Sequence, residues 1–275
     1  LLPQFLKKRE FDYDTAVDGM RQMLWGFFKK LLVANNCVAA VDSRFYLYSR
    51  TDMPGSEMVL AALLFSFQIY ADFSGYSDIA IGTAKLFGIK LKRNFNNPYF
   101  SRNIPEFWRN WHMSLMSWFR DYVYIPLGGS RNGKLKTAFN VLLVFLLSGL
   151  WHGANWTYLV WGGYHALLFL PFVFVGKQQG QIGQTDGRRW PTKCKEIGAT
   201  LLTFFLVTFG WIIFRSESIT AFASFCKGMC QIGSLRAFYR FFTQSDIWPI
   251  TVFIVVMMVV EWLQRDKEHG LEISR

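Results

Sequence analysis

Long apolar stretches alternate with short polar segments along this chain. The longest, residues 137–176, contains no Asp, Glu, Lys or Arg. A transmembrane helix needs roughly 20 mostly apolar residues, so this stretch predicts two spans, or one span followed by a broken re-entrant helix. Gly149, Gly153 and Asn155 mark the expected break.

Further apolar blocks predict additional membrane-embedded helices, roughly five to seven in all. These blocks are Met58–Ala71, Ile79–Ile89, Ile197–Phe214 and Ile247–Leu263. Residues 16–41 are amphipathic, with Lys29 and Lys30 in the middle, and predict an interfacial helix or a tilted span. The whole pattern predicts an all-α, multi-pass integral membrane protein.

Composition and charge agree with this class. Hydrophobic residues make up 52% of the chain, too many for an ordinary soluble domain. A net charge of +11 would suggest nucleic acid in a soluble protein. Here the basic residues flank apolar blocks, as cytosolic loops beside anionic headgroups do. We therefore expect the lipid bilayer as a partner and no nucleic acid.

The cysteines and the chain ends add little chemistry. The four cysteines have no metal-ligand spacing, so we expect free thiols packed among apolar groups. The chain begins Leu1-Leu2-Pro3 without Met, which predicts an internal piece of a longer protein. Residues 177–195, rich in Gln, Gly and charge, predict a solvated loop.

A first polar interruption, residues 68–80, brings carboxylates, hydroxyls and a glycine into an apolar run. It fits a surface loop between two spans, or a buried, unwound polar segment. The flanking apolar pieces are short, and no basic residue lies between Arg50 and Lys85. The buried segment is therefore at least as good an interpretation as the loop.

A second polar segment, residues 103–115, carries the signals of a helix start. Asn103 and Glu106 have the spacing of an N-cap and capping box, and Pro105 fits the first turn. We predict a helix that continues to about Arg120.

Arg109 and His112 are three residues apart and would share one face of that helix. The helix would either lie among the headgroups, with its tryptophans as an aromatic belt, or re-enter the membrane. In the second case it would carry Arg109 and His112 into a cavity.

His152 is the strongest candidate for chemistry. An ionisable group at membrane depth is a functional-site hypothesis by default, and imidazole can move a proton near neutral pH. The alternative is an interfacial or packing histidine. His165 we expect to pack at a helix–helix contact. No third ligand accompanies His112 and His152 at a recognisable spacing, so we expect no metal.

Two membrane histidines, an arginine and several tryptophans suit acyl transfer. A neutral histidine in a low-dielectric pocket can remove a proton from an acceptor hydroxyl as that hydroxyl attacks a thioester. The second histidine, the arginine or backbone N–H groups could then stabilise the oxyanion. We expect His152 as the general base, His112 to orient the donor carbonyl or the acceptor, and Arg109 to bind a donor phosphate. The reverse assignment of the two histidines stays open.

Four segments resemble the membrane-bound O-acyltransferase family, in its alginate O-acetylation branch. They are residues 68–78 (QIYADFSGYSD), 104–115 (IPEFWRNWHMSL), 118–129 (WFRDYVYIPLGG) and 149–156 (GLWHGANW). The resemblance implies a multi-pass helical fold with re-entrant or interfacial helices around a central cavity. It places the family's membrane histidine at His152 and its second histidine at His112.

The resemblance also implies an O-acetyltransferase that uses a cytosolic thioester, acetyl-CoA, as donor substrate and has no tightly bound cofactor. The acetyl group would end on an exported or cell-envelope polysaccharide, through a periplasmic or extracellular acyltransferase partner. The location implied is the inner cell membrane. We expect substrates to contact Arg109, Trp108, Trp111, Trp151, Asn155, Tyr76 and Asp78.

The chain departs from the family pattern in two ways. It lacks the N-terminal spans, and Asn110 stands where a second arginine is usual. We expect the C-terminal portion of one membrane domain: a motif-bearing region over residues 1–170, a loop over 177–195 and further spans over 196–264. Alternatives are D-alanyl transfer onto teichoic acid by the same fold, a transporter, or a non-catalytic scaffold for a secreted acyltransferase.

Overall fold

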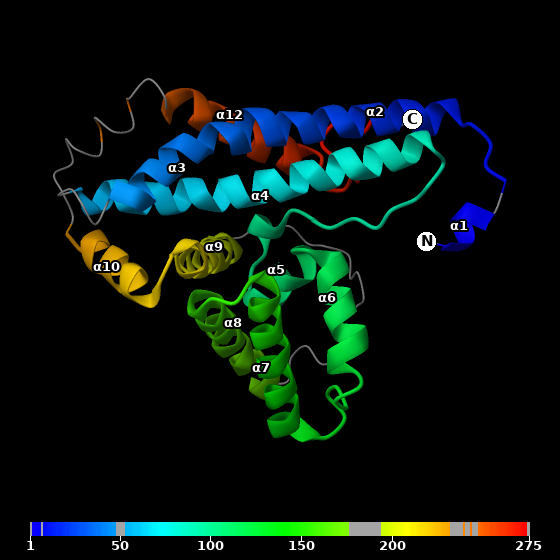
Figure 1. Ribbon diagram of the computed structural model, residues 1–275. Coiled ribbons are helices and arrows are strands. Elements are labelled where there is room, and N and C mark those ends of the chain that lie inside the picture. Colours follow the sequence, from blue (N-terminus) through cyan, green and yellow to red (C-terminus); the bar gives the residue numbers. More distant parts are fainter. Residues whose placement is uncertain are drawn as a thin grey trace. The chain divides into compact units, whose positions relative to one another are not determined.

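The computed structural model describes residues 2–6, 8–47, 53–175, 194–231, 239, 243 and 247–273. All regular elements among these residues are helical, which confirms the all-α prediction (Figure 1). The chain divides into two compact units, residues 1–94 with 225–275 and residues 95–224. The expected loop at 177–195 lies almost wholly outside the described residues.

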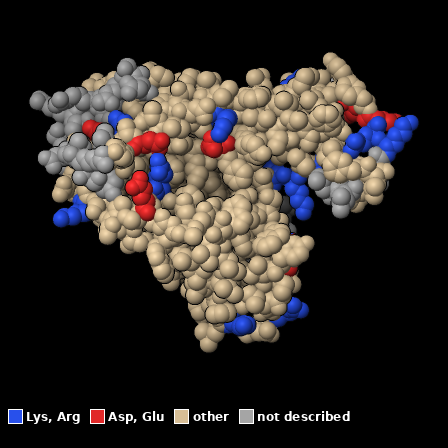
Figure 2. All heavy atoms as spheres, in the orientation of Figure 1, with Lys and Arg blue, Asp and Glu red and all other residues tan. Residues whose placement is uncertain are grey.

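Four helices in the described part of the chain are long and apolar enough to cross a membrane. They are α4 (Gly55–Leu86), α7 (Gly133–His152), α8 (Trp156–Val175) and α9 (Cys194–Arg215). A fifth apolar helix, α12 (Ile247–Leu263), is shorter. Figure 2 shows a largely uncharged face, with charged side chains in small separate groups.

The first unit is built on a pair of long helices (Figure 1). After the short helix α1 (Leu2–Leu6), α2 (Tyr13–Phe27) continues through a π-helical segment, Phe28–Ala34, into α3 (Asn35–Leu47). This run packs along α4 through glycines, as membrane helices commonly do.

One glycine contact shows how closely these helices approach. A Cβ on Gly26 would lie 2.6 Å from the carbonyl oxygen of Gly75, so neither position has room for a side chain. The expected loop or unwound segment at residues 68–80 is wrong, because α4 runs through it without a break. Tyr70 and Asp78 find partners on neighbouring elements instead, and the backbone stays helical.

A buried ion cluster supplies those partners. The Lys29 ammonium lies 2.6 Å from the Asp78 carboxylate and 3.9 Å from that of Glu261 on α12. Gln22 donates to Asp78 (2.9 Å), and the Tyr70 hydroxyl donates to Glu261 (2.8 Å). The cluster therefore ties α2, α4 and α12 together, and Lys29 contributes from its π-helical segment.

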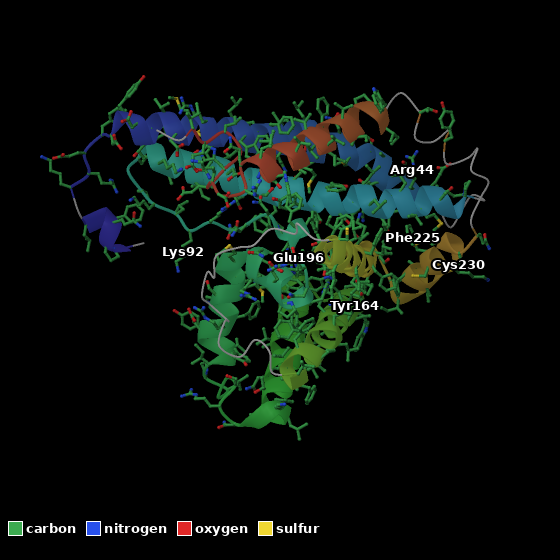
Figure 3. The ribbon with its side chains drawn as sticks, turned by 180° about the vertical axis from the view of Figure 1, so that it is seen from behind. Arg44, Lys92, Tyr164, Glu196, Phe225 and Cys230 are labelled. Atoms are coloured by element: carbon green, nitrogen blue, oxygen red, sulfur yellow. The ribbon has the colours of Figure 1, made fainter. Side chains whose placement is uncertain are left out.

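The C-terminal residues complete the first unit. Phe225 on α10 (Ile219–Met229) stacks on Phe45, with ring centroids 4.5 Å apart (Figure 3 labels Phe225). His269 is buried, and its Nε2 lies 3.1 Å from Asp18 on α2. Although the sequence around His269 is highly charged, Asp18 supplies the partner that makes the burial of this ring favourable.

The second unit contains an antiparallel hairpin of α7 and α8. The two helices are separated only by residues 153–155, which confirms two helices with a break at the predicted glycine and asparagine. Gly149 faces the Tyr158 carbonyl and Gly162 faces that of Phe145, so the backbones approach closely. At the other end of the hairpin, Lys134 donates to the Phe174 carbonyl (2.7 Å).

Helix α9 and several short helices pack against this hairpin. The Tyr164 hydroxyl of α8 donates to the Leu206 carbonyl of α9 (2.9 Å), and Glu196 lies 4.0 Å from Arg102 (Figure 3 labels Tyr164 and Glu196). The short helices are a 3-10 turn Pro98–Phe100, α5 (Ile104–Asn110), α6 (Met113–Phe119) and a π-helical turn Arg120–Tyr124.

The ion cluster makes a prediction about stability. Replacing Lys29 with Met should lower the free energy of unfolding by about 3–5 kcal/mol, because two buried carboxylates would lose their cation. Lys30→Met is the matched control. Lys30 pairs with Asp72, both side chains are substantially exposed, and such pairs contribute about 0–1 kcal/mol. Thermal unfolding in detergent compares the two variants. Equal losses of stability in both would contradict a dominant contribution from the buried ion pair of Lys29 and Asp78.

Candidate active site

His112 lies at a break between two helices. The helix predicted to reach Arg120 instead stops at Asn110, and α6 starts at Met113. Trp111 is extended, and His112 adopts a left-handed conformation (φ 43°, ψ 54°) that non-glycine residues rarely occupy. The face that Arg109 and His112 were expected to share therefore does not exist.

Local packing explains the break. The Trp111 ring is buried, with its centroid 5.0 Å from that of Phe95 and 4.9 Å from that of Trp211. The Asn110 side chain donates to the Ser101 hydroxyl (3.2 Å) and to a backbone carbonyl. These tertiary contacts end α5 after about two turns, although local propensity allows the helix to continue.

The start of α5 is as predicted. The Asn103 side chain accepts a hydrogen bond from the Glu106 N–H (2.9 Å), which confirms the N-cap. The Glu106 carboxylate accepts from the Arg102 N–H (2.8 Å), one residue before the position expected for a capping box.

His152 is the last residue of α7, directly at the hairpin turn. Gly153 follows with φ 146° and ψ 166°, a conformation essentially restricted to glycine. The Asn155 side chain accepts from the Thr157 N–H (3.1 Å) and donates to the Glu217 carbonyl (3.0 Å). The turn that carries His152 is thus fixed on both sides.

The structure brings the two histidines together. The His112 ring centroid lies 6.0 Å from that of Trp151, which in turn lies 5.0 Å from that of His152. Burial, and to a smaller extent the nearby charge of a protonated His152, lowers the pKa of His112 from 6.5 to about 4. His112 is therefore neutral at physiological pH.

Aromatic rings surround the half-buried His152. The ring centroids of Phe214, Trp161 and Tyr158 lie 4.9, 5.4 and 6.1 Å from that of His152. Phe214 comes from α9, and the other two come from α8. Their apolar surfaces lower the local dielectric, which strengthens electrostatic interactions at this position.

Four other residues that we predict to contact substrate lie in the second unit. Trp108 and Trp111 are buried inside the second unit, so neither belongs to an exposed aromatic belt. Arg109 is partly buried on α5, and Trp151 is 58% exposed at the turn. Their roles in substrate binding stay predictions.

Tyr76 and Asp78 lie on α4 in the first unit. Tyr76 is exposed, and Asp78 is engaged by Lys29 and Gln22. A substrate contact for either residue also remains a prediction. The salt bridge explains the burial of Asp78 without invoking a substrate.

His165 is fully buried where α8 meets α9. A Cβ on Gly210 would lie 2.5 Å from the His165 Nε2, so α9 can approach this ring only at a glycine. Its position agrees with the expected helix–helix contact. Trp161, four residues before His165 on α8, contacts the ring, and so does Trp108 of α5. No local sequence pattern indicates the Trp108 contact, because it joins two separate helices.

Comparison with known proteins matches the sequence to a family. The sequence model of the membrane-bound O-acyltransferase family matches residues 20–191, a range that includes both histidines. The chain belongs to this family.

Several curated relatives are similar over most of this chain. A probable alginate O-acetylase AlgI of Pseudomonas syringae is 41% identical over 80% of this chain and 39% of its own length. A peptidoglycan O-acetyltransferase of Helicobacter pylori is 36% identical over 83% of this chain and 42% of its own length. A teichoic acid D-alanyltransferase of Bacillus subtilis is 32% identical over 74% of this chain and 52% of its own length. The chain thus spans about half the length of these relatives or less.

The lowered pKa of His112 makes a prediction about stability and pH. An unfolded histidine binds a proton near pH 6.5, whereas folded His112 stays neutral down to about pH 4. Between these values the unfolded chain binds more protons, so the stabilising contribution present above pH 6.5 is lost as pH falls toward 4.

Thermal unfolding in detergent from pH 7 to 4 measures this effect. His112→Asn should flatten part of the decline, because asparagine does not titrate there and tolerates left-handed backbone. Identical pH dependence in the two proteins would contradict the burial of a neutral imidazole.

Proposed function

We propose that this chain is the histidine-bearing part of a membrane O-acyltransferase. It would transfer an acetyl group from a cytosolic thioester donor, acetyl-CoA, for O-acetylation of an exported or cell-envelope polysaccharide. The observation that carries the proposal is the pairing of His112 and His152 at two helix ends in an aromatic setting. Family membership and the named relatives support the same reaction class.

The proposed chemistry needs one base and one donor of hydrogen bonds. His152 removes the proton from the acceptor hydroxyl, whose oxygen attacks the thioester carbonyl. His112, neutral at working pH, donates to the oxyanion and stabilises the tetrahedral intermediate. The C–S bond then breaks, the protonated His152 returns its proton to the departing thiolate, and the ester remains on the acceptor.

Charge along the hairpin supports transfer across a membrane. Lys134 and Lys136 lie in the first turn of α7, Arg131 lies two residues before the helix, and His152 lies at its end. Basic residues favour the cytosolic face, and a helix of this length rises about 30 Å, the thickness of the hydrocarbon core. His152 would then face the extracytoplasmic side of the inner membrane, where a polysaccharide or a periplasmic acyltransferase partner can be reached.

A second candidate keeps the same fold and changes the cargo. Transfer of D-alanine onto teichoic acid is named for one relative, at 32% identity. The relatives named as O-acetylases are more similar to this chain, at 36–41% identity, which favours acetyl. A transporter or a scaffold for a secreted enzyme would not need His112 and His152 in contact with the same tryptophan.

The proposal predicts the effect of removing the base. His152→Ala in the full-length protein, in cells that lack the native copy, should abolish ester-linked acetate on the exported polysaccharide at normal membrane abundance. A base of this kind typically contributes about 10²–10⁴-fold to rate. His269→Gln is the control, because His269 lies in the other unit. Retained acetylation with His152→Ala would remove His152 from the chemistry and favour the scaffold.

Arg109 tests the binding of the donor. We expect Arg109→Met to raise the KM for acetyl-CoA about tenfold or more with a smaller change in kcat, because an arginine–phosphate hydrogen bond contributes about 1.5–3 kcal/mol. Arg109→Lys should retain part of the affinity. An unchanged KM in the methionine variant would assign the phosphate contact to another residue.

A further inference from the structure

Among the described residues, aromatic rings from three helices are arranged around His152. The rings of Phe214 and Trp161 stand at 86° and 89° to the imidazole plane, with their centroids 4.9 and 5.4 Å from its own. Trp151 stands at 80° and 5.0 Å, and Tyr158 stands at 44° and 6.1 Å. We call these four rings the His152 cage. Two of its members therefore meet the imidazole almost at right angles.

Packing holds the Phe214 ring in its place within the cage. Its centroid lies 5.0 Å from that of Tyr158, 5.3 Å from that of Trp161 and 5.8 Å from that of Trp211. Trp161 and Trp211 are buried themselves. The position of Phe214 against the imidazole is thus set by three other rings of the second unit.

The His152 ring has no charged partner in the part of the chain that the structure describes. It forms neither a hydrogen bond nor an ion pair there, and residues 137–175 contain no Asp, Glu, Lys or Arg. The elements around it supply few titratable or charged side chains, namely His112, Tyr158, Arg215 and Glu217. None of these is paired with the imidazole, so the aromatic rings are its main electrostatic surroundings.

A histidine that acts as a base becomes a cation when it takes the proton. In serine hydrolases a buried carboxylate behind the histidine stabilises this imidazolium. Aromatic rings can supply part of the same effect, because their faces are partly negative and attract a cation, most strongly where water is excluded. A perpendicular pair of rings directs the edge of one at the face of the other, which brings the positive edge of an imidazolium to a ring face.

We propose that Phe214 and Trp161 stabilise the imidazolium that forms on His152 during acyl transfer. The proton of the acceptor hydroxyl moves to an imidazole nitrogen, the two ring faces attract the resulting cation, and the proton then leaves with the thiolate. Both rings act through His152 and touch no reacting atom. This inference rests on the proposed function, because it requires His152 to be the base.

Stepwise fluorination of Phe214 tests the inference at nearly constant shape. Each fluorine withdraws electron density from the ring face, so mono-, di- and trifluorophenylalanine should bind a cation progressively less well. The full-length protein carries these residues at position 214 in cells that lack the native copy, and their isolated membranes receive saturating radiolabelled acetyl-CoA. The rate of ester-linked acetate formation per protein molecule should fall at each step, to about a tenth with three fluorines.

A leucine variant adds a readout that depends on charge. Phe214→Leu keeps an apolar side chain without a ring, and should lower the same rate about tenfold. The acid limb of the pH–rate profile reports protonation of the base. Because the variant stabilises the cation less, this limb should move to lower pH by about half a unit to one unit. Phe209→Leu is the matched control, since Phe209 lies on the same helix and packs on Tyr164 and Phe222.

Three results would overturn the inference. They are a constant rate across the fluorinated series, an acid limb that does not move in Phe214→Leu, and equal losses of rate in Phe214→Leu and Phe209→Leu. Each would assign the Phe214 ring to packing alone. Should Phe214→Leu fold poorly, the fluorinated series decides, because fluorine changes the charge distribution of the ring more than its size. Acetate formation that survives His152→Ala would remove the proposed function itself.

Discussion

The site depends on one constraint, that a helix end packed inside protein needs partners for the backbone groups that it frees. The chain meets this constraint at both histidines. At His152, Gly153 turns the backbone and Asn155 binds it on two sides. At His112, buried Trp111 and hydrogen-bonded Asn110 hold the break. Both imidazoles therefore lie where a helix meets a turn, one before α6 and one at the end of α7.

The first unit meets the same constraint by a different route. There the helices continue, and polar side chains are paired across them by Lys29, Asp78 and Glu261. Charges in a low-dielectric interior stabilise a structure only in mutual contact, so the cluster fixes which helices are neighbours. The close approach of Gly26 and Gly75 brings the charged groups within reach.

The sequence predicted what local patterns encode. The charge-free stretch from 137 to 176 predicted two helices and their break, and Asn103 predicted the start of α5. Features that depend on distant partners were missed. Nothing near residues 68–80 shows that the π-helical segment after α2 supplies a lysine, and nothing near residue 111 shows that α9 supplies Trp211. The contact of His112 with Trp151, the chain neighbour of His152, likewise depends on the folded chain.

The π-helical segment Phe28–Ala34 shifts the helical periodicity of the run that contains it. A π-helical turn holds one residue more than an α-helical turn, so the side-chain faces before and after it differ by one position, about 100° of rotation. A helical wheel drawn without interruption from Ala16 to Val41 assigns one half of the run to the wrong face. Comparison of this region between related chains must therefore treat Lys29 as the point where the periodicity is reset.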